Sequence, residues 1–454
     1  MINAIKKLSI LSLLVLTFGC KKENERVFEE EPNARQAKVI DKLYTMLTTS
    51  ENGWKVTIYP KGGKGFRHWM KLKNNDRVEM VSDFNVTSAT VVKESTFRIS
   101  ALQTPTLIFD TYNYIHLPYD PTASVSGGTT NGTGLLSDIE FFPNANLVDS
   151  LLKDLPVSKT VLIGKYNGNY TVFEKATAAE ETAYKAGGLD KTRTSVFDYL
   201  KTSPYFYLVA GSGNLRIQTG INTTGKNVTL SVFEWDSVAT PGPVTFAYTL
   251  NSLKLSRTLS FKGIEFDELF WDEATKSLYY LNGTTKVFLQ KSATPLIPFY
   301  SQYGYLKTYA LITVNVTNLP DQSPAFLQVY NTAVAGLAAV GNNAGRRLNY
   351  FTIRFGEDKT MLLSAFYNNS AGSNFTATFT YNINWIDKDK VSFVYVGRDG
   401  NANTAGPGIV ALTNYLEQNE FLIDWFTSST TTASLGGFKI ANNPNSYFFG
   451  ALAR

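Results

Sequence analysis

Hydrophobic and polar residues follow two different periods in the early part of the chain. Between residues 32 and 50 the apolar positions recur every three or four residues, which predicts an amphipathic helix that begins at Pro32. Asn52-Gly53 is typical of a helix end, and residues 54–59 alternate as in a half-buried strand. A helix followed by a strand is therefore expected. The apolar positions of the helix are Ala37, Ile40, Leu43, Tyr44 and Leu47.

Short alternating segments separated by turn residues make up most of the remaining chain. Residues 66–73 and 77–82 flank Asn74-Asn75-Asp76 and are predicted to form a hairpin. A second hairpin is predicted for residues 161–164 and 170–173. Many short strands joined by turns favour antiparallel sheets. Further strands are predicted at residues 96–99, 106–114, 138–142, 228–234, 244–250, 258–261, 278–281 and 446–452, and from residue 349 onward.

Helical patterns interrupt the strands at a few places. Short helices are predicted at residues 176–185 and 192–201, a longer one opens at Pro324, and a late one spans residues 409–426. The predicted fold class is therefore α+β, with predominantly antiparallel β-sheets and a few packed amphipathic helices. Residues 292–298 contain two prolines and break the pattern, so we place a domain boundary there.

Two β-rich domains are expected, over residues 32–291 and 299–454, because the chain is longer than one ordinary core supports. Residues 352–366 parallel residues 70–84 in their order of strand, turn and strand. That similarity suggests a diverged tandem repeat, with shared hairpin chemistry as the alternative.

The first residues have the pattern of a lipoprotein signal peptide. Lys6-Lys7 precede an apolar run of about 11 residues, which is too short to span a bilayer and ends directly before Gly19-Cys20. We predict that residues 1–19 are removed, that Cys20 carries a palmitate-type lipid, and that residues 20–31 form a tether. The alternatives are an unlipidated secretory signal or a buried structural thiol. Residues 21–25 resemble the charged tags of surface-exposed lipoproteins, which implies the outer membrane and the cell surface.

Charge and metal-ligand content exclude several classes of function. Loss of Lys6 and Lys7 lowers the formal net charge from +5 to +3, and the basic residues form no block, so we expect no nucleic-acid partner. The chain has 2 histidines and a single cysteine, too few for a His/Cys zinc site, and we predict no metal and no cofactor. Calcium remains open at Asp267, Glu268, Asp272 and Glu273, for which a solvated turn is the alternative.

Aromatic residues are the best candidates for ligand recognition, because flat apolar rings edged by hydrogen-bonding groups suit a carbohydrate or peptide surface. They make up 13% of the chain, so most of them are expected to fill the core. Strict alternation over residues 109–117 would place Asp110, Tyr112, Tyr114 and His116 on one face of a strand. Together with Trp54, these residues are the predicted ligand contacts. The alternative is an ordinary sheet face whose rings fill the core.

A hydrolase is the second possibility for the candidate chemistry. Asp138 and Glu140 would lie roughly 7 Å apart on one strand face, a spacing that two-carboxylate hydrolysis of glycans allows, and Asp110 is a third candidate. No Gly-x-Ser-x-Gly elbow accompanies the histidines, which argues against a serine nucleophile. The glycine-rich residues 127–134 lack the ending of a phosphate-binding loop and are predicted to be a surface loop.

Three segments carry a family resemblance: residues 51–55 (Glu-Asn-Gly-Trp-Lys), residues 106–112, and residues 132–141. They resemble the lipoprotein family known as domain of unknown function 4302, most strongly over residues 20–175. That family has no established activity, so the resemblance supplies no catalytic residue. The genes of its members lie beside those of outer-membrane nutrient importers, which implies a surface accessory protein.

The sequence therefore favours a non-enzymatic, lipid-anchored surface protein. We expect it to bind a nutrient, either glycan or peptide, or a partner in an outer-membrane import complex. A secreted hydrolase that uses carboxylates is the alternative, and a structural adhesin-like module is a third interpretation.

Overall fold

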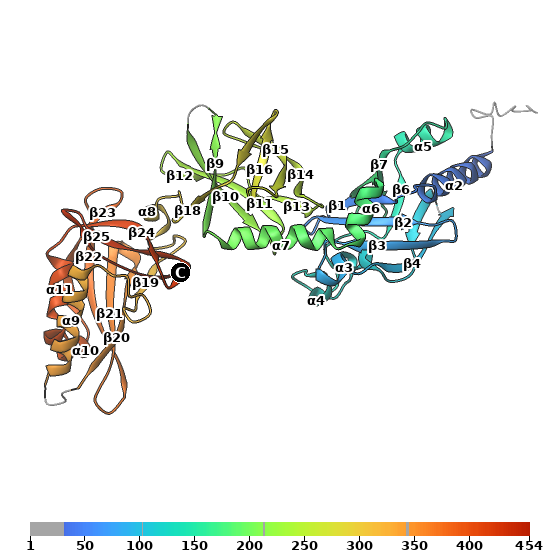
Figure 1. Ribbon diagram of the computed structural model, residues 1–454. Helices are drawn as coiled ribbons and strands as arrows, with labels where there is room; N and C mark the ends of the chain where they lie inside the picture. Colours follow the sequence, from blue (N-terminus) through green and yellow to red (C-terminus); the bar gives the residue numbers. More distant parts are fainter. Residues whose placement is uncertain (1–30, 102, 212–213, 342–344) are drawn as a thin grey trace, which may run out of the picture.

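The computed structural model describes residues 31–101, 103–211, 214–341 and 345–454, and these form three β-sheets in succession (Figure 1). Two of the sheets are closed barrels of eight strands, and a ten-stranded sheet lies between them. The predicted signal peptide, Cys20 and the tether up to residue 30 lie outside the described residues. The α+β class with predominantly antiparallel sheets is confirmed.

The N-terminal barrel is built from eight antiparallel strands in chain order, and β1 pairs with β8 to close it. Helix α2 (Pro32–Thr48) places Leu43 and Leu47 in the same buried core as Trp54 and Phe173, so the amphipathic helix completes the barrel interior. Closure leaves no unpaired sheet edge. The strands are β1 (Trp54–Ile58), β2 (Phe66–Leu72), β3 (Arg77–Ser82), β4 (Lys93–Ala101), β5 (Pro105–Phe109), β6 (Glu140–Pro143), β7 (Lys159–Gly164) and β8 (Tyr170–Lys175).

Short helices fill the connections of this barrel. They are α3 (Val86–Thr90), η1 (Tyr114–Tyr119), α4 (Ala123–Ser126) and α5 (Ala145–Leu152). Two further helices, α6 (Ala178–Lys185) and α7 (Gly188–Lys201), lead from the barrel into the middle sheet, and α7 lies beneath the middle sheet in the view of Figure 1.

The middle sheet receives the apolar face of α7, whose Val196 and Tyr199 belong to its core. Its strand order, β17-β16-β15-β14-β13-β11-β10-β9-β18, follows the chain except that β18 returns to pair with β9. The strands are β9 (Tyr205–Ala210), β10 (Leu215–Asn222), β11 (Asn227–Glu234), β12 (Ser237–Ala239), β13 (Val244–Tyr248), β14 (Ser252–Phe261), β15 (Ile264–Asp272), β16 (Ser277–Asn282), β17 (Thr285–Phe288) and β18 (Gln290–Ser292).

The C-terminal barrel repeats the sequential order and closes through pairing of β19 with β26. Helix α9 (Pro324–Ala339) buries Phe326, Tyr330 and Leu337 in its core. The strands are β19 (Leu311–Val314), β20 (Arg347–Phe355), β21 (Thr360–Asn368), β22 (Asn374–Trp385), β23 (Lys390–Arg398), β24 (Phe421–Ser428), β25 (Thr431–Ile440) and β26 (Asn443–Ala453). The other helices are α8 (Phe299–Gln302), η3 (Glu357–Lys359), α10 (Gly400–Ala405), η4 (Gly406–Gly408) and α11 (Val410–Glu417).

The late helix predicted over residues 409–426 is wrong in its second half. Helix α11 ends at Glu417, and the following apolar residues form β24, which pairs with β25 along its length. Phe421 and Ile423 are buried in alternation, which is the period of a strand. A short apolar run fits both periods, and here the neighbouring strand decided between them.

The predicted boundary at residues 292–298 lies between β18 and α8, and residues 32–291 contain both the N-terminal barrel and the middle sheet. The two segments that suggested a repeat are both hairpins that join the second and third strands of a barrel. Their turns contain Asp76 with φ of 61° and Asp358 with φ of 51°, a left-handed conformation that aspartate tolerates. Among the described helices, none has the length and apolar content needed to cross a membrane.

Candidate functional site

The strand face predicted for Asp110, Tyr112, Tyr114 and His116 does not form. Strand β5 ends at Phe109, and the chain then turns into the 3₁₀ helix η1 (Tyr114–Tyr119). Asn113 causes this change, since its side chain accepts a hydrogen bond from the Tyr114 backbone N–H and its own N–H donates to His116 Nδ1. Such a reciprocal cap starts a helical turn and ends the alternation.

The turn nevertheless gathers three of the predicted residues. Tyr112 stacks on His116 with ring centroids 5.3 Å apart, and Lys93 Nζ lies 5.4 Å and 5.9 Å from the ring centres of Tyr112 and Tyr114. Tyr114 and His116 are each only 8% exposed, whereas Tyr112 is 49% exposed. Burial lowers the pKa of His116, so the imidazole is neutral at pH 7. Of these three side chains, Tyr112 has the ring that a ligand can reach.

The other two predicted contacts lie elsewhere. Asp110 forms an ion pair with Arg98 at 3.0 Å. Trp54 is 0% exposed in the barrel core, and its Nε1–H donates to the carbonyl of Leu47 at 2.9 Å. A fully buried ring cannot touch a ligand in this structure, so Trp54 is a core residue.

The carboxylates proposed for hydrolysis do not form a pair on one strand face. Asp138 precedes β6 and is 0% exposed. Its oxygens accept hydrogen bonds from the backbone of Tyr166 and Asn167 and from Asn169 Nδ2, so Asp138 orders the β7–β8 turn. Glu140 pairs with Lys165 at 2.9 Å. This prediction was wrong because Asp138 lies buried in the irregular segment before β6, outside the strand.

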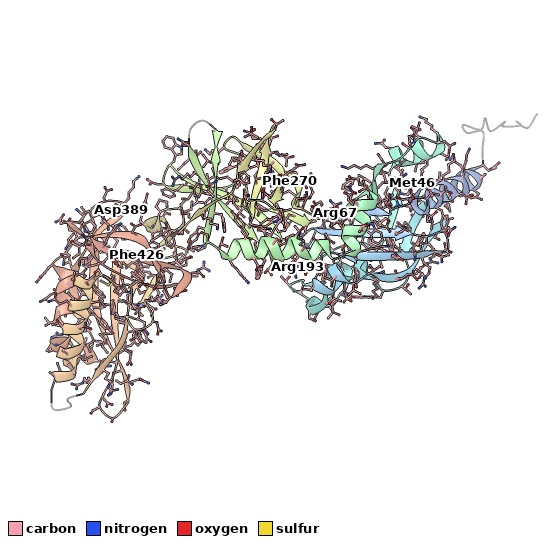
Figure 2. All side chains as sticks on the ribbon, in the orientation of Figure 1. Met46, Arg67, Arg193, Phe270, Asp389 and Phe426 are labelled. Atoms are coloured by element: carbon pink, nitrogen blue, oxygen red, sulfur yellow. The ribbon has the colours of Figure 1, made fainter. Side chains whose placement is uncertain are left out.

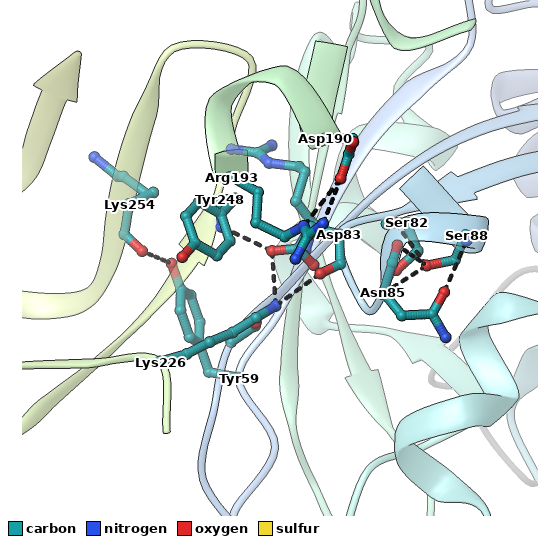
Figure 3. Close-up of polar contacts among 12 residues, drawn as sticks. Tyr59, Ser82, Asp83, Asn85, Ser88, Asp190, Arg193, Lys226, Tyr248 and Lys254 are labelled. Carbon is teal, nitrogen blue, oxygen red and sulfur yellow. Dashed lines mark hydrogen bonds and ion pairs between the residues drawn. The ribbon is translucent and has the colours of Figure 1, made fainter. Parts of the chain in front are cut away.

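A buried ion pair joins the N-terminal barrel to the middle sheet (Figure 3). Asp83, directly after β3, accepts hydrogen bonds from Lys226 Nζ at 2.9 Å, the Tyr248 backbone N–H at 2.7 Å and the Arg67 backbone N–H at 2.9 Å. Lys226 Nζ also donates to the carbonyls of Gly65 at 3.0 Å and Asp83 at 3.1 Å. All three protons of the ammonium group are therefore satisfied inside the protein.

Aromatic rings complete the surroundings of Lys226, whose Nζ lies 4.3 Å from the ring centre of Phe66 and 5.6 Å from that of Tyr248. Burial lowers the pKa of Lys226, Asp83 opposes that shift, and the nearby charges of Lys64 and Arg193 add to it. The lysine is thus close to two further cations. A buried pair of this kind orients the elements that carry it.

The backbones of the N-terminal barrel and the middle sheet approach each other closely around this ion pair. A Cβ at Gly65 would lie 2.6 Å from the Phe246 carbonyl oxygen, and the Gly65 N–H donates to that oxygen at 3.0 Å. Tyr59 O–H donates to the Lys254 carbonyl at 2.9 Å. Glycine is needed at position 65 because any side chain would separate the two backbones.

A cleft of about 430 Å³ opens beside the ion pair; we call it the junction cleft. Its walls come from the β1–β2 loop, α4, α7 and the β10–β11 turn. Figure 2 shows Arg193 of α7 at this junction, far from Phe426 on the C-terminal barrel. The lining includes the cations Lys64 and Arg193, the rings Phe84 and Phe197, and the hydroxyl residues Ser124, Thr223 and Thr224.

Two cations of the junction cleft retain free hydrogen-bond donors. Lys64 Nζ donates to the Gly127 carbonyl at 3.0 Å and has no carboxylate partner among the described residues. Arg193 directs Nε and Nη2 to Asp190 Oδ1, at 3.0 Å and 2.6 Å, and its Nη1 makes no hydrogen bond to the rest of the described chain. Phe197 is 46% exposed next to them. The junction cleft is thus lined by cationic hydrogen-bond donors and by an accessible aromatic ring.

Sequence reasoning missed the junction cleft. Its residues come from segments far apart in the chain, and none of them belongs to a spaced motif. Lys226 has a φ of 45° in the β10–β11 turn, and the sequence does not reveal this conformation for a lysine.

A second groove, of about 480 Å³, lies on the C-terminal barrel. Its Asp321 accepts hydrogen bonds from Ser428 and Ser429, and its Lys439 is paired with Asp424. Both charged groups of this groove are already engaged, so the junction cleft is the better candidate for a charged ligand.

The acidic cluster in the second half of β15 is paired with lysines. Lys254 pairs with Asp267 at 2.8 Å and with Glu268 at 3.1 Å, and Lys286 pairs with Asp272 at 2.5 Å. Within the described ranges, no group of three or more His, Cys, Asp or Glu side chains could hold a metal ion.

Comparison with known proteins identifies one family and little else. The model of the family described as "Domain of unknown function (DUF4302)" matches residues 24–273. The match includes every residue that lines the junction cleft. None of the curated proteins matches the chain.

Among solved structures, the chain is similar to the crystal structure of a mutant of the vaccine antigen Transferrin Binding Protein B (TbpB) from Haemophilus parasuis Hp5. The identity is 9%, and the alignment covers 88% of this chain and 73% of that one. The TM-score is 0.13, which is too low to carry an argument about fold or function.

Proposed function

The chain belongs to the DUF4302 family, and from this premise we propose that it is a non-enzymatic, lipid-anchored cell-surface protein that binds a ligand in the junction cleft. The ligand is a nutrient, either glycan or peptide, that the protein presents to an outer-membrane importer. The observation that carries this proposal is the cleft itself, in which free cationic donors and an exposed ring line one cavity.

The Asp83–Lys226 pair supports a preformed site. It holds the β1–β2 loop, the end of β3 and the β10–β11 turn in fixed positions, and these three segments supply part of the cleft wall. A site whose walls are already in place loses little conformational entropy on binding.

The lining also favours binding over hydrolysis. Carboxylate-dependent hydrolysis of glycans needs two carboxyl groups that face the scissile bond. Asp83 is the one carboxylate that lines the junction cleft, and it accepts three hydrogen bonds within the protein.

The lipid anchor in this proposal is inferred from the sequence pattern that ends at Cys20. Helix α2 begins at the end of the molecule that lies farthest from the C-terminal barrel (Figure 1).

Glycan-array and peptide-library binding of the detergent-solubilised full chain tests the proposal. We expect at least one compound to bind the wild type and to bind Phe197→Ala roughly 5- to 30-fold more weakly, since a lost ring contact at a binding site costs about 1–2 kcal/mol. Phe375→Ala is the matched control, because it removes a partly exposed ring from the C-terminal barrel. Equal affinity of the two variants for every bound compound would refute the junction cleft as the ligand site.

A further inference from the structure

We propose that the ligand of the junction cleft is an acidic sugar of one or two rings, whose carboxylate is bound by Lys64 and Arg193. This inference rests on the proposed function and specifies its ligand.

The charges around the cleft do not cancel. Lys64, Arg193 and Lys226 are positive, and the carboxylates of Asp83 and Asp190 are negative. One positive charge is left, and the Asp83–Lys226 pair is internally neutral, so the excess belongs to Lys64 and Arg193. One carboxylate placed against these two cations would neutralise it.

The free donors match a carboxylate. Lys64 Nζ uses one proton on the Gly127 carbonyl, which leaves two, and Arg193 Nη1 has its protons free of any described partner. These donors line the same cavity, Lys64 from the β1–β2 loop and Arg193 from α7, so one carboxylate in that cavity is the acceptor that we assign to both. Charge-assisted hydrogen bonds of this kind are the strong ones.

Unpaired cations are common on protein surfaces and are no evidence of a site by themselves. The junction cleft differs because its two cations share a cavity of about 430 Å³, which is within the usual range for small-ligand pockets. The exposed Phe197 ring provides a flat apolar surface, and Ser124, Thr223 and Thr224 provide hydroxyl groups.

A sugar fits these walls better than a peptide does. Extended peptides are usually bound along an open sheet edge, and helical ones in a long apolar groove. The junction cleft is instead a compact cavity bounded by a loop, a short helix, a turn and one face of α7. A sugar ring can stack its apolar face on Phe197 while its hydroxyl groups bond to the serine and threonine side chains.

Isothermal titration of the detergent-solubilised full chain tests this inference. The acidic probes are digalacturonate, glucuronate and N-acetylneuraminate, the neutral probe is galactobiose, and the peptide probe is Asp-Asp. We expect one acidic sugar to bind, and to bind more weakly as the salt concentration rises. Lys64→Met should weaken that binding roughly 10- to 100-fold, because a charge-assisted hydrogen bond is lost.

Two further variants distinguish the loss of a positive charge in the cleft from a loss of folding. Lys64→Arg should retain most of the affinity, because it keeps the positive charge, and Lys359→Gln, on the C-terminal barrel, should behave as wild type. Unchanged melting temperatures of all three variants would exclude a folding defect.

Each contrary outcome is informative. Binding of galactobiose as tight as that of the acidic sugars would overturn the carboxylate assignment. Tighter binding of Asp-Asp through the same residues would overturn the sugar. If no acidic sugar binds, but Phe197→Ala abolishes the binding of another compound, this inference fails and the proposed function stands. If Phe197→Ala affects no compound, both fail.

Discussion

At the scale of single residues, burial separates the side chains that hold this fold from those that can meet a ligand. Trp54 and Tyr112 are both aromatic candidates in the sequence, yet Trp54 is 0% exposed and Tyr112 is 49% exposed. Alternation along a strand assigns a side chain to one of two faces but does not say which face is covered. The ligand-binding role of Tyr112 stays a prediction.

His68 shows how burial sets charge at this scale. It is 0% exposed, and both ring nitrogens lack a hydrogen-bond partner among the described residues. Burial, with Lys226 and Arg67 nearby, lowers the pKa of His68 to about 3. Since its unfolded pKa is about 6.5, the unfolded chain binds more protons between pH 6.5 and pH 3. The contribution of neutral His68 to the free energy of unfolding is therefore fully present above pH 6.5 and is lost as the pH falls below that value.

We predict that the free energy of unfolding falls by about 2 kcal/mol between pH 7.5 and pH 5 because of His68 alone. His68→Leu should unfold at a similar denaturant concentration at pH 7.5, within about 1.5 kcal/mol, and should lose that part of the acid sensitivity. Urea unfolding at both pH values measures the difference. If the mutant and the wild type lose equal stability on acidification, His68 is not the group responsible.

At the scale of elements, the Asp83–Lys226 pair connects strands of two sheets. Asp83 follows β3 of the N-terminal barrel, Lys226 precedes β11, and the Asp83 carboxylate also binds the backbone of β13. Removal of one partner leaves the other charge buried and uncompensated, and such changes typically cost about 3–5 kcal/mol.

We therefore predict that Asp83→Asn lowers the free energy of unfolding by about 3 kcal/mol or more, measured by calorimetry or denaturant unfolding. Asp267→Asn is the matched control, because that carboxylate is mostly exposed in its pair with Lys254 and should cost about 0–1 kcal/mol. The double variant Asp83→Asn with Lys226→Met should be more stable than Asp83→Asn, since no charge is then left buried. Equal stability of Asp83→Asn and Asp267→Asn would contradict the role of the pair.

At the scale of the whole molecule, the chain consists of three sheets in a row, and the first two are joined more closely than the last two (Figure 1). The contacts across the second junction include Trp425 Nε1–H to the Ile297 carbonyl at 2.7 Å and the exposed pair of Lys388 with Asp236 at 2.5 Å. The family match ends at residue 273, near the end of the middle sheet. The junction cleft therefore lies wholly within the part of the chain that defines the family.

We predict that Cys20→Ala releases the whole molecule from membranes, because the lipid on that cysteine is the proposed anchor. Detergent partition of fractionated cells and incorporation of labelled palmitate measure the change. A mutant that remains membrane-bound, or a wild type that takes up no label, would rule out the anchor. Binding of a ligand in the junction cleft should be unchanged in this variant, since the described residues that line the cleft all lie between Lys64 and Tyr248.

The sequence by itself determined the local elements of this protein. Helices α2 and α9 and the hairpins β2–β3 and β7–β8 follow from apolar period, a proline at the helix start and turn residues, which act over a few positions. The α+β class and the antiparallel sheets follow from many such elements.

Only the tertiary structure decided what depends on partners distant in the chain. Pairing of β1 with β8 closes a barrel across more than a hundred residues, and pairing with β25 makes residues 421–428 a strand. Burial turned Trp54 and Asp138 from candidate site residues into structural ones. The junction cleft lies where the Asp83–Lys226 pair joins two sheets, so Lys64, Arg193 and Phe197 line one cavity. The free energy of such contacts depends on which segments meet, and no local pattern contains that information.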